Sequence, residues 1–380
     1  MTAPALGARL PELRTEIPGP ASRAMAERLR RVESRNITYM DDGWPVFWSD
    51  ARGANVVDAD GNVFVDLTSA FGVGLLGHRS DPLERALAEQ TLVHGMGDIH
   101  PPSVKLELLE RLAGIGPWDE SRVVLASTGS EAVEIGLKTG ALASGRPGVL
   151  AFEGGYHGLT LGSLAATERP HFRERFEDRL YRGVAFAPFP DAVRDEDPGG
   201  AASLRAVEER LARGAPNGDP IGTIVVEPVQ ARGGARIPPD GFMAGLSDLA
   251  EAHGVTIVAD EIFTGIGRCG ALLASPRVGL RPHVVCVGKA LGAGLPISAC
   301  IAQAEVMDAW PPSSGEAVHT STFLGHPLAC AAAIRVLDAM ADGTTMAEVD
   351  RVGAAILAGL HARLDGAACV GDVRGLGLLL

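Results

Sequence analysis

The sequence predicts an α/β fold built around a mostly parallel sheet that helices cover on both faces. From about residue 80 onward, helical stretches alternate with short apolar runs rich in β-branched residues. Strands that are buried on both faces read as such continuous apolar runs. The chain also has 380 residues, which is enough for about two domains.

The N-terminal part differs from this alternating pattern. The first 50 residues are rich in arginine, glutamate and proline, and one helix is expected over residues 24–32. Two strand-like runs then flank Asp60-Gly61-Asn62, and this arrangement is typical of a β-hairpin. We expect residues 1–75 to be an N-terminal segment that contributes to a small domain.

Helices and strands alternate through the middle of the chain. The expected helices cover residues 81–90, 105–115, 130–144, 203–213 and 241–254. The expected strands cover residues 122–127, 148–152, 183–188, 222–228, 255–261 and 283–289. Together they predict a large domain over residues 76–330.

The C-terminal part is expected to be helical again, over residues 326–340 and 347–364. The last ten residues, GDVRGLGLLL, are expected to begin a strand. We therefore expect residues 331–380 to be the start of a C-terminal small domain that is truncated.

Composition and charge exclude several classes of protein. The 47 acidic residues outnumber the 34 basic ones, which disfavours binding to nucleic acid or to an anionic membrane. The sequence has neither a signal-peptide core nor an uninterrupted apolar run of about 18 residues. Its five cysteines have no CxxC or zinc spacing, so we expect reduced thiols, no metal site and a cytoplasmic location.

Lysine is scarce, and one lysine has an unusual position. The chain contains only Lys105, Lys138 and Lys289. Lys289 follows an apolar strand, where burial would lower its pKa and favour the free amine that a Schiff base needs. The alternative is a lysine that extends to the surface from a strand end.

Other functional side chains follow the remaining strands, where open α/β sheets bind their ligands. Asp260 is either a functional acid or a helix N-cap. The segment Thr128-Gly129-Ser130 is either an anion site at a helix N-terminus or a simple cap made by Ser130. Tyr156 either offers a flat face for stacking or fills the core. An amine, a carboxylate, an aromatic face and a phosphate-binding helix terminus together match the four groups of pyridoxal phosphate.

The sequence resembles the class III (subgroup II) pyridoxal-phosphate-dependent aminotransferases, such as those for 4-aminobutyrate and other ω-amino acids. The resemblance extends from about residue 39 to the end. It rests on VDLTSAFGVGLLGH, STGSEAVEIGLK, GGYHGLTLG, EPVQARGG, ADEIFTGIGRCG, VVCVGKALGAGLPISA and STFLGHPLACAAA. It implies fold type I, with a large cofactor-binding domain and a smaller α+β domain built from both chain ends. It also implies a homodimer with shared active sites.

The resemblance implies three catalytic residues. Lys289 would form the internal aldimine with pyridoxal phosphate and later move a proton between substrate and cofactor. Asp260 would pair with the pyridinium nitrogen. Tyr156 would stack on one face of the cofactor ring.

It also implies further cofactor contacts. Gly129 and Ser130 would hold the phosphate, Gln230 would contact the phenolic oxygen, and Ile262 would cover the second face of the ring. Thr322 would reach the phosphate in the neighbouring subunit.

The substrate positions depart from the family pattern. Glu227 is expected to order the site near Lys289. Arg232 replaces a glutamate that is usual in the family, and Leu159 stands where some members that bind acidic substrates carry arginine. Arg232 either binds a carboxylate or forms a surface ion pair, so the glutamate and 2-oxoglutarate couple does not carry over.

We therefore expect a transaminase that moves an amino group from an ω-amino acid, a diamine or another primary amine to a 2-oxo acid in ping-pong half-reactions. Two alternatives stay open. One is an aminomutase or a decarboxylating, dialkylglycine-type enzyme of the same fold. The other is a truncated homologue that binds pyridoxal phosphate without turnover.

Overall fold

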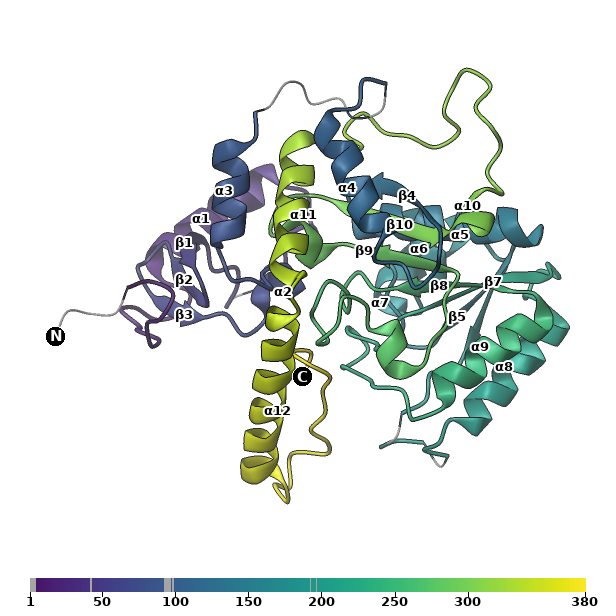
Figure 1. Ribbon diagram of the computed structural model, residues 1–380. Helices are drawn as coiled ribbons and strands as arrows, with labels where there is room; N and C mark the ends of the chain where they lie inside the picture. Colours follow the sequence, from purple (N-terminus) through teal and green to yellow (C-terminus); the bar gives the residue numbers. More distant parts are fainter. Residues whose placement is uncertain (1–4, 42, 92–96, 98, 192, 196) are drawn as a thin grey trace. The chain divides into compact units, whose positions relative to one another are not determined.

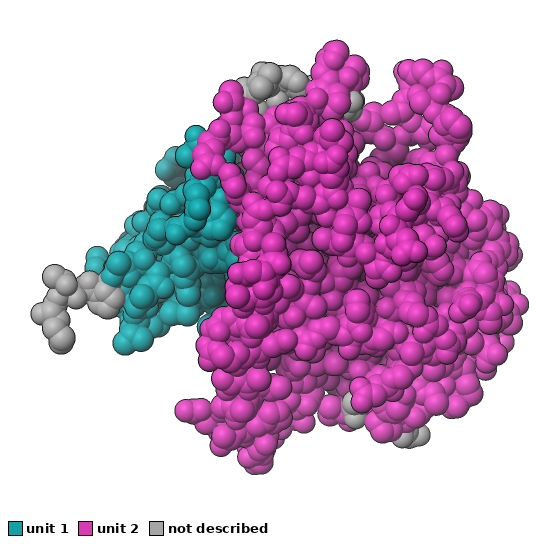
Figure 2. Space-filling view, in the orientation of Figure 1, with its two compact units in different colours: residues 1–88 teal, residues 89–380 magenta. Residues whose placement is uncertain are grey.

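The structure, a computed structural model, describes residues 5–41, 43–91, 97, 99–191, 193–195 and 197–380. The chain divides into two compact units, Met1–Ala88 and Glu89–Leu380, which Figures 1 and 2 show in sequence colours and in unit colours.

The first unit contains a three-stranded antiparallel sheet. Its strands are β1 (Trp48–Arg52), β2 (Asn55–Asp58) and β3 (Val63–Val65), in that order. Three helices are α1 (Pro20–Val32), α2 (Ser69–Gly72) and α3 (Asp81–Glu89), the last of which ends at the unit boundary. The predicted helix and hairpin are confirmed. The Asp58 carboxylate closes the hairpin turn because it accepts hydrogen bonds from the N–H groups of Asp60 and Asn62.

The second unit is built on a seven-stranded sheet. Its order, over the described residues, is β4 (Ser121–Ala126), β10 (Ser298–Gln303), β9 (Val284–Val287), β8 (Thr256–Asp260), β7 (Ile221–Val226), β5 (Gly148–Phe152) and β6 (Val184–Ala187). Neighbours from β9 to β6 are parallel, whereas β10 is antiparallel to both β9 and β4. All six predicted strands are present.

Strand β10 is a strand that the sequence pattern did not reveal. Its residues, SACIAQ, are mostly small and lack the β-branched run that marks the other strands. It is nevertheless buried, because it lies between β4 and β9 in the sheet. The sheet is therefore mixed and mostly parallel, as expected.

Helices cover the sheet on both faces (Figure 1). The helices of this unit, over the described residues, are α4 (Ser103–Ala113), α5 (Gly129–Ser144), α6 (Leu161–Ala166), α7 (Pro170–Arg173), α8 (Ala201–Arg213), α9 (Phe242–His253), α10 (Ala304–Met307), α11 (Pro327–Met340) and α12 (Thr344–Leu364). Three 3-10 turns are η1 (Glu174–Arg179), η2 (Ser275–Val278) and η3 (Lys289–Gly292). Helix α5 packs along β4 and β7–β10, while α8 and α9 pack on the opposite face.

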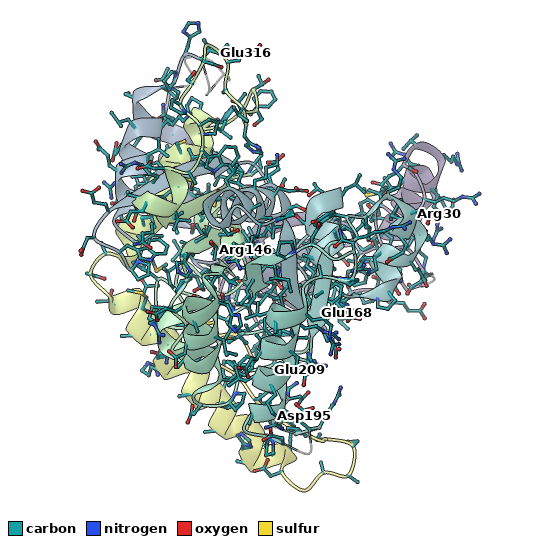
Figure 3. All side chains as sticks on the ribbon, turned by 90° about the vertical axis from the view of Figure 1, so that its right-hand side faces the viewer. Arg30, Arg146, Glu168, Asp195, Glu209 and Glu316 are labelled. Carbon is teal, nitrogen blue, oxygen red and sulfur yellow. The ribbon has the colours of Figure 1, made fainter. Side chains whose placement is uncertain are left out.

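Two contacts show how closely α5 fits the sheet. A Cβ atom added at Gly136 would lie 2.8 Å from Val258 Cγ1, so the glycine lets the helix approach β8. Arg146, labelled in Figure 3, lies just beyond the end of α5 and donates a 3.1 Å hydrogen bond to the carbonyl of His253, the last residue of α9. The first contact sets the middle of α5 against β8, and the second joins the segment after α5 to the end of α9.

The C-terminal ten residues do not form a strand, contrary to the prediction. They form a turn closed by a bridge between Leu376 and Leu379, with Gly377 in the left-handed region at φ +59°. The N–H of Leu378 donates to the carbonyl of Arg268, which fixes the turn against the loop after β8. None of the helices in the described residues has the length and apolar character needed to cross a membrane.

Candidate active site

The carboxyl ends of β4, β5, β7, β8 and β9 surround a cavity of about 550 Å³ in the second unit. Its lining residues are Thr128, Gly129, Ser130, Tyr156, His157, Gly158, Leu159, Thr160, Glu227, Ala231, Arg232, Asp260, Ile262, Phe263 and Lys289. This volume lies within the range of small-molecule and cofactor sites. Parallel strands end at the same edge, which is why residues so far apart in sequence meet here.

Lys289 is half-buried at the start of η3, and Gly288 separates it from the end of β9. Its φ of +41° is unusual for a residue with a side chain, and such backbone strain concentrates at functional sites. Burial lowers the pKa of its ammonium group, and the Arg232 charge acts in the same direction, while Asp260 and Glu227 oppose the shift. The Lys289 Nζ atom lies 4.6 Å from the centre of the Phe263 ring. The structure thus places this lysine in the cavity and favours its free amine.

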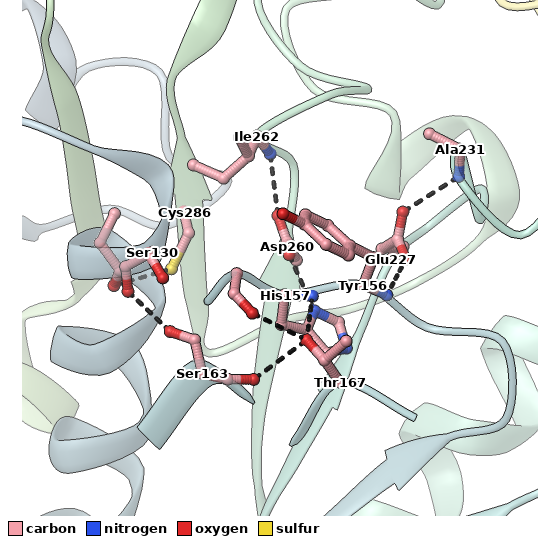
Figure 4. A network of polar contacts seen from close by, with 12 residues as sticks. Ser130, Tyr156, His157, Ser163, Thr167, Glu227, Ala231, Asp260, Ile262 and Cys286 are labelled. Carbon is pink, nitrogen blue, oxygen red and sulfur yellow. Dashed lines mark hydrogen bonds and ion pairs between the residues drawn. The ribbon is translucent and has the colours of Figure 1, made fainter. Parts of the chain in front are cut away.

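Asp260 ends β8 and is buried. Its Oδ2 atom lies 2.8 Å from Nδ1 of His157, and its Oδ1 accepts a hydrogen bond from the N–H of Ile262 at 3.1 Å. Figure 4 shows this network. Burial alone would lower the pKa of His157, but the hydrogen bond and charge of Asp260, aided by Glu227, raise it. Asp260 is therefore held as the acceptor of a buried histidine in the cavity wall.

Glu227 follows β7 and is buried beside the same pair (Figure 4). Its two carboxylate oxygens accept hydrogen bonds, each 3.0 Å long, from the N–H groups of Tyr156 and Ala231. Burial raises the pKa of Glu227 to about 7, opposed by His157 and reinforced by Asp260. Glu227 joins the two loops that carry Tyr156 and Ala231.

Tyr156 presents a half-buried ring to the cavity. The ring meets Phe172 edge-on, with their centres 5.5 Å apart. The guanidinium carbon of Arg232 lies 4.3 Å from the centre of the Tyr156 ring. Tyr156 is thus held in place by an aromatic and a cationic neighbour and lies at the cavity instead of filling the core.

The N-terminus of α5 opens into the cavity. Its N-cap is Thr128, not Ser130 as the capping alternative supposed, because the Thr128 side chain and Glu131 form a reciprocal capping box. The N–H groups of Gly129 and Ser130 have no acceptor among the described residues. Ser130 Oγ accepts from the N–H groups of the 159–160 loop. Two free N–H groups at a helix start are suited to an anion.

Ile262 closes one side of this helix terminus. A Cβ atom added at Gly129 would lie 2.8 Å from Ile262 Cγ2, and one added at Gly288 would lie 3.1 Å from Ile262 Cδ1. Both glycines therefore let the isoleucine lie close against the backbone of α5 and η3. Its position is fixed by packing as well as by its hydrogen bond to Asp260.

Two predicted site residues do not line the cavity. Gln230 is buried, donates from Nε2 to the carbonyl of Glu153, and its Oε1 has no partner among the described residues. Thr322 is exposed in the segment before α11, where its carbonyl accepts from the N–H of Gly97.

Two side chains of the cavity, His157 and Phe263, are among those to which the sequence assigns no role. His157 follows Tyr156 directly, and its burial against Asp260 depends on the pairing of β5 and β8 through β7, which no local pattern reveals. Phe263 follows Ile262, and only its position beside the lysine distinguishes it from a core aromatic.

Known proteins resemble this chain in both sequence and fold. The family model of class III aminotransferases matches residues 38–380. An acetylornithine aminotransferase from Methanopyrus kandleri is 34% identical over 339 residues, which cover 89% of this chain and 80% of that protein. A 4-aminobutyrate aminotransferase from Mycobacterium leprae is 31% identical, with coverages of 97% and 83%.

A solved structure agrees with these relatives. An amine transaminase from an uncultivated Pseudomonas species, in its PLP-bound internal aldimine form, superposes with a TM-score of 0.82 at 29% identity and covers 91% of this chain and 82% of that one. Since the family model spans most of the sequence and the relatives exceed 30% identity, the chain belongs to the class III aminotransferases, as its motifs predicted.

Proposed function

We propose that the chain transfers an amino group from an ω-amino acid or related primary amine to a 2-oxo acid at the cavity around Lys289. The reaction class follows from membership in the class III aminotransferases. The observation that supports this site is the meeting of a half-buried lysine, a buried carboxylate and a free helix N-terminus in one cavity.

The cofactor is pyridoxal phosphate, and the residues present fit it. The free N–H groups at the start of α5 suit its phosphate, and the buried carboxylate of Asp260 suits a protonated ring nitrogen. When bound, the cofactor supplies an aldehyde and an electron-accepting ring. Gly129 and Ser130 would hold the phosphate, while Tyr156 and Ile262 would cover the ring faces.

Lys289 would hold the aldehyde carbon and then act as the base. Burial lowers the pKa of Lys289, so its Nζ atom can accept the proton from the carbon that bears the substrate amine. The same atom would then pass this proton to the cofactor. Asp260 stays in place because His157 and the Ile262 N–H hold its two oxygens. Glu227 orders the site through its two backbone hydrogen bonds.

Further parts of the proposal concern the assembly. Gln230 would approach the phenolic oxygen of the cofactor, and Thr322, which is exposed, would reach the phosphate site of a second copy in a homodimer. Residues 76–330 would form the large domain, and residues 1–75 and 331–380 would contribute to the small one. The protein would act in the cytoplasm.

The half-reactions test this function. Protein loaded with pyridoxal phosphate is mixed with 4-aminobutyrate, N-acetylornithine or butane-1,4-diamine without an acceptor, and the cofactor absorbance and the carbonyl product are followed. One carbonyl product per site is expected, and pyruvate or 2-oxoglutarate should restore the original absorbance. Lys289→Ala should abolish the conversion, whereas the matched variant Lys138→Ala should not.

The outcome separates the proposal from its rivals. A decarboxylating enzyme would release carbon dioxide, and an aminomutase would return an isomeric amine without consuming a 2-oxo acid. A loaded protein that converts no amine in any half-reaction would contradict the proposal.

A further inference from the structure

Two arginines share one aromatic ring beside the cavity. The guanidinium carbons of Arg232 and Arg169 lie 5.2 Å and 5.4 Å from the centre of the Phe172 ring. Arg232 also lies 4.3 Å from the centre of the Tyr156 ring, and its carbonyl accepts a 3.4 Å hydrogen bond from Nη1 of Arg169. Arg232 both lines the cavity and is exposed, so its guanidinium lies where the cavity meets solvent.

No side-chain carboxylate neutralises these two guanidinium groups. Within the described residues, neither Arg169 nor Arg232 has an acidic partner within 4.0 Å, whereas two nearby arginines do: Arg173 pairs with Glu177, and Arg236 with Asp191. The cations are therefore held by aromatic faces instead of anions, which leaves their N–H groups available to a ligand.

Arg232 lies near a second basic group, Lys289, and an anionic ligand would reduce the repulsion between their charges. The Arg232 charge lowers the pKa of the Lys289 amine, because two positive charges near one another repel. A bound anion would cancel this repulsion. Leu159, which also lines the cavity, is apolar and supplies no counter-charge to Arg232.

We propose that Arg232 binds a carboxylate of the substrate, with the rings of Tyr156 and Phe172 fixing the plane of its guanidinium. A planar guanidinium held on a ring can still present its N–H fork to both oxygens of a carboxylate. The substrates are then carboxylate-bearing amines and oxo acids, in preference to diamines and simple alkylamines. Arg169 does not line the cavity, and its part is to position the loop through the Arg232 carbonyl. The inference rests on the proposed function and names its substrate class.

The test uses ligands that cannot react. Glutarate, valerate and glutaramide are titrated calorimetrically into protein loaded with pyridoxal phosphate. The three share a five-carbon chain and carry two carboxylates, one carboxylate and none. The variants are Arg232→Met, Arg232→Lys and the control Arg205→Met, which removes an exposed arginine on α8. Circular dichroism checks that each variant is folded.

We expect Arg232→Met to weaken valerate and glutarate binding about 10- to 100-fold, because a charge-assisted hydrogen-bonded pair is lost. Glutaramide binding should stay unchanged, Arg232→Lys should keep part of the affinity, and Arg205→Met should match the wild type. In turnover, Arg232→Met should raise KM for 5-aminovalerate much more than KM for pentylamine, so that the ratio of the two KM values changes.

Equal affinity of the acids for wild type and Arg232→Met would overturn the inference, as would a wild type that binds the acids no better than glutaramide. Either result leaves the proposed function intact if Lys289 still attaches the cofactor. If the wild type attaches no cofactor, the proposed function fails, and the same titrations on cofactor-free protein decide the role of Arg232.

Discussion

His157 and Asp260 form a buried pair in which Nδ1 of the histidine lies 2.8 Å from Oδ2 of the aspartate. Both side chains are almost inaccessible to solvent, and the histidine Nε2 has no partner among the described residues. The pair explains how the Asp260 carboxylate is fixed in orientation in the cavity wall.

Replacing the histidine should therefore affect both stability and the cofactor. His157→Leu leaves Asp260 with the Ile262 N–H alone, so we expect a loss of about 3 kcal/mol in the free energy of unfolding. Cofactor affinity should fall as well. His157→Asn keeps an N–H donor near the same place and should lose less of both. Urea unfolding and cofactor titration measure the two effects, and unchanged values in the leucine variant would refute the role of the pair.

Glu261, the next residue along, is expected to serve the fold. Its oxygens accept four hydrogen bonds, from Thr264 Oγ1, the N–H of Ala274, and both the N–H and Oγ of Ser275. In Glu261→Gln, the side-chain NH2 group would face N–H and O–H groups that need an acceptor. We expect the free energy of unfolding to fall by about 3 kcal/mol. The control is Glu209→Gln, an exposed residue of α8 labelled in Figure 3. Equal urea midpoints for the two variants would contradict this account.

Replacing Gly129 is predicted to weaken cofactor binding for steric reasons. The Cβ of Gly129→Ala would lie 2.8 Å from Ile262 Cγ2, so Ile262 must move from the place where it lines the cavity. We expect cofactor affinity to fall about tenfold, which corresponds to about 1.4 kcal/mol. Gly371→Ala, where an added Cβ meets nothing within 4 Å, is the control. The prediction is wrong if cofactor titrations give the same affinity for both variants.

The reactivity of Lys289 should depend on pH in a defined direction. Because burial and the Arg232 charge lower its pKa below the ordinary 10.5, its free amine should be present at lower pH than that of an ordinary lysine. The rate of covalent cofactor attachment should rise with pH and level off below pH 10.5. Arg232→Met removes one of the lowering causes, so its curve should shift to higher pH. A midpoint at or above 10.5 in the wild type would disagree with this environment.

Local patterns in the sequence predicted most of the fold. The six apolar runs were predictable as strands because a strand that is buried on both faces of a sheet has apolar residues at consecutive positions. Strand β10 was missed because small residues carry little strand preference, and burial between two neighbours decides its state. The C-terminal turn was missed because Gly375 and Gly377 permit a bend where apolar periodicity suggested extension.

The site was predictable only in part. Asp260 ends a strand, and Lys289 and Tyr156 lie in the loops that follow strands, so the topology of the sheet brings them to one edge. The pairing of Asp260 with His157, and the contacts of the Arg232 guanidinium with two aromatic rings, depend on packing between loops that are far apart in sequence. Such contacts have no local sequence signal.

The central claim is that Lys289 holds the cofactor, and covalent trapping tests it most directly. The purified chain is incubated with pyridoxal phosphate, reduced with borohydride, digested and mapped by mass spectrometry. With only three lysines in the sequence, each one can be assigned without ambiguity. We predict one pyridoxyl group per chain, on Lys289, and none on Lys105 or Lys138. A folded protein with no adduct at Lys289, or with label spread equally over the three lysines, would contradict the account.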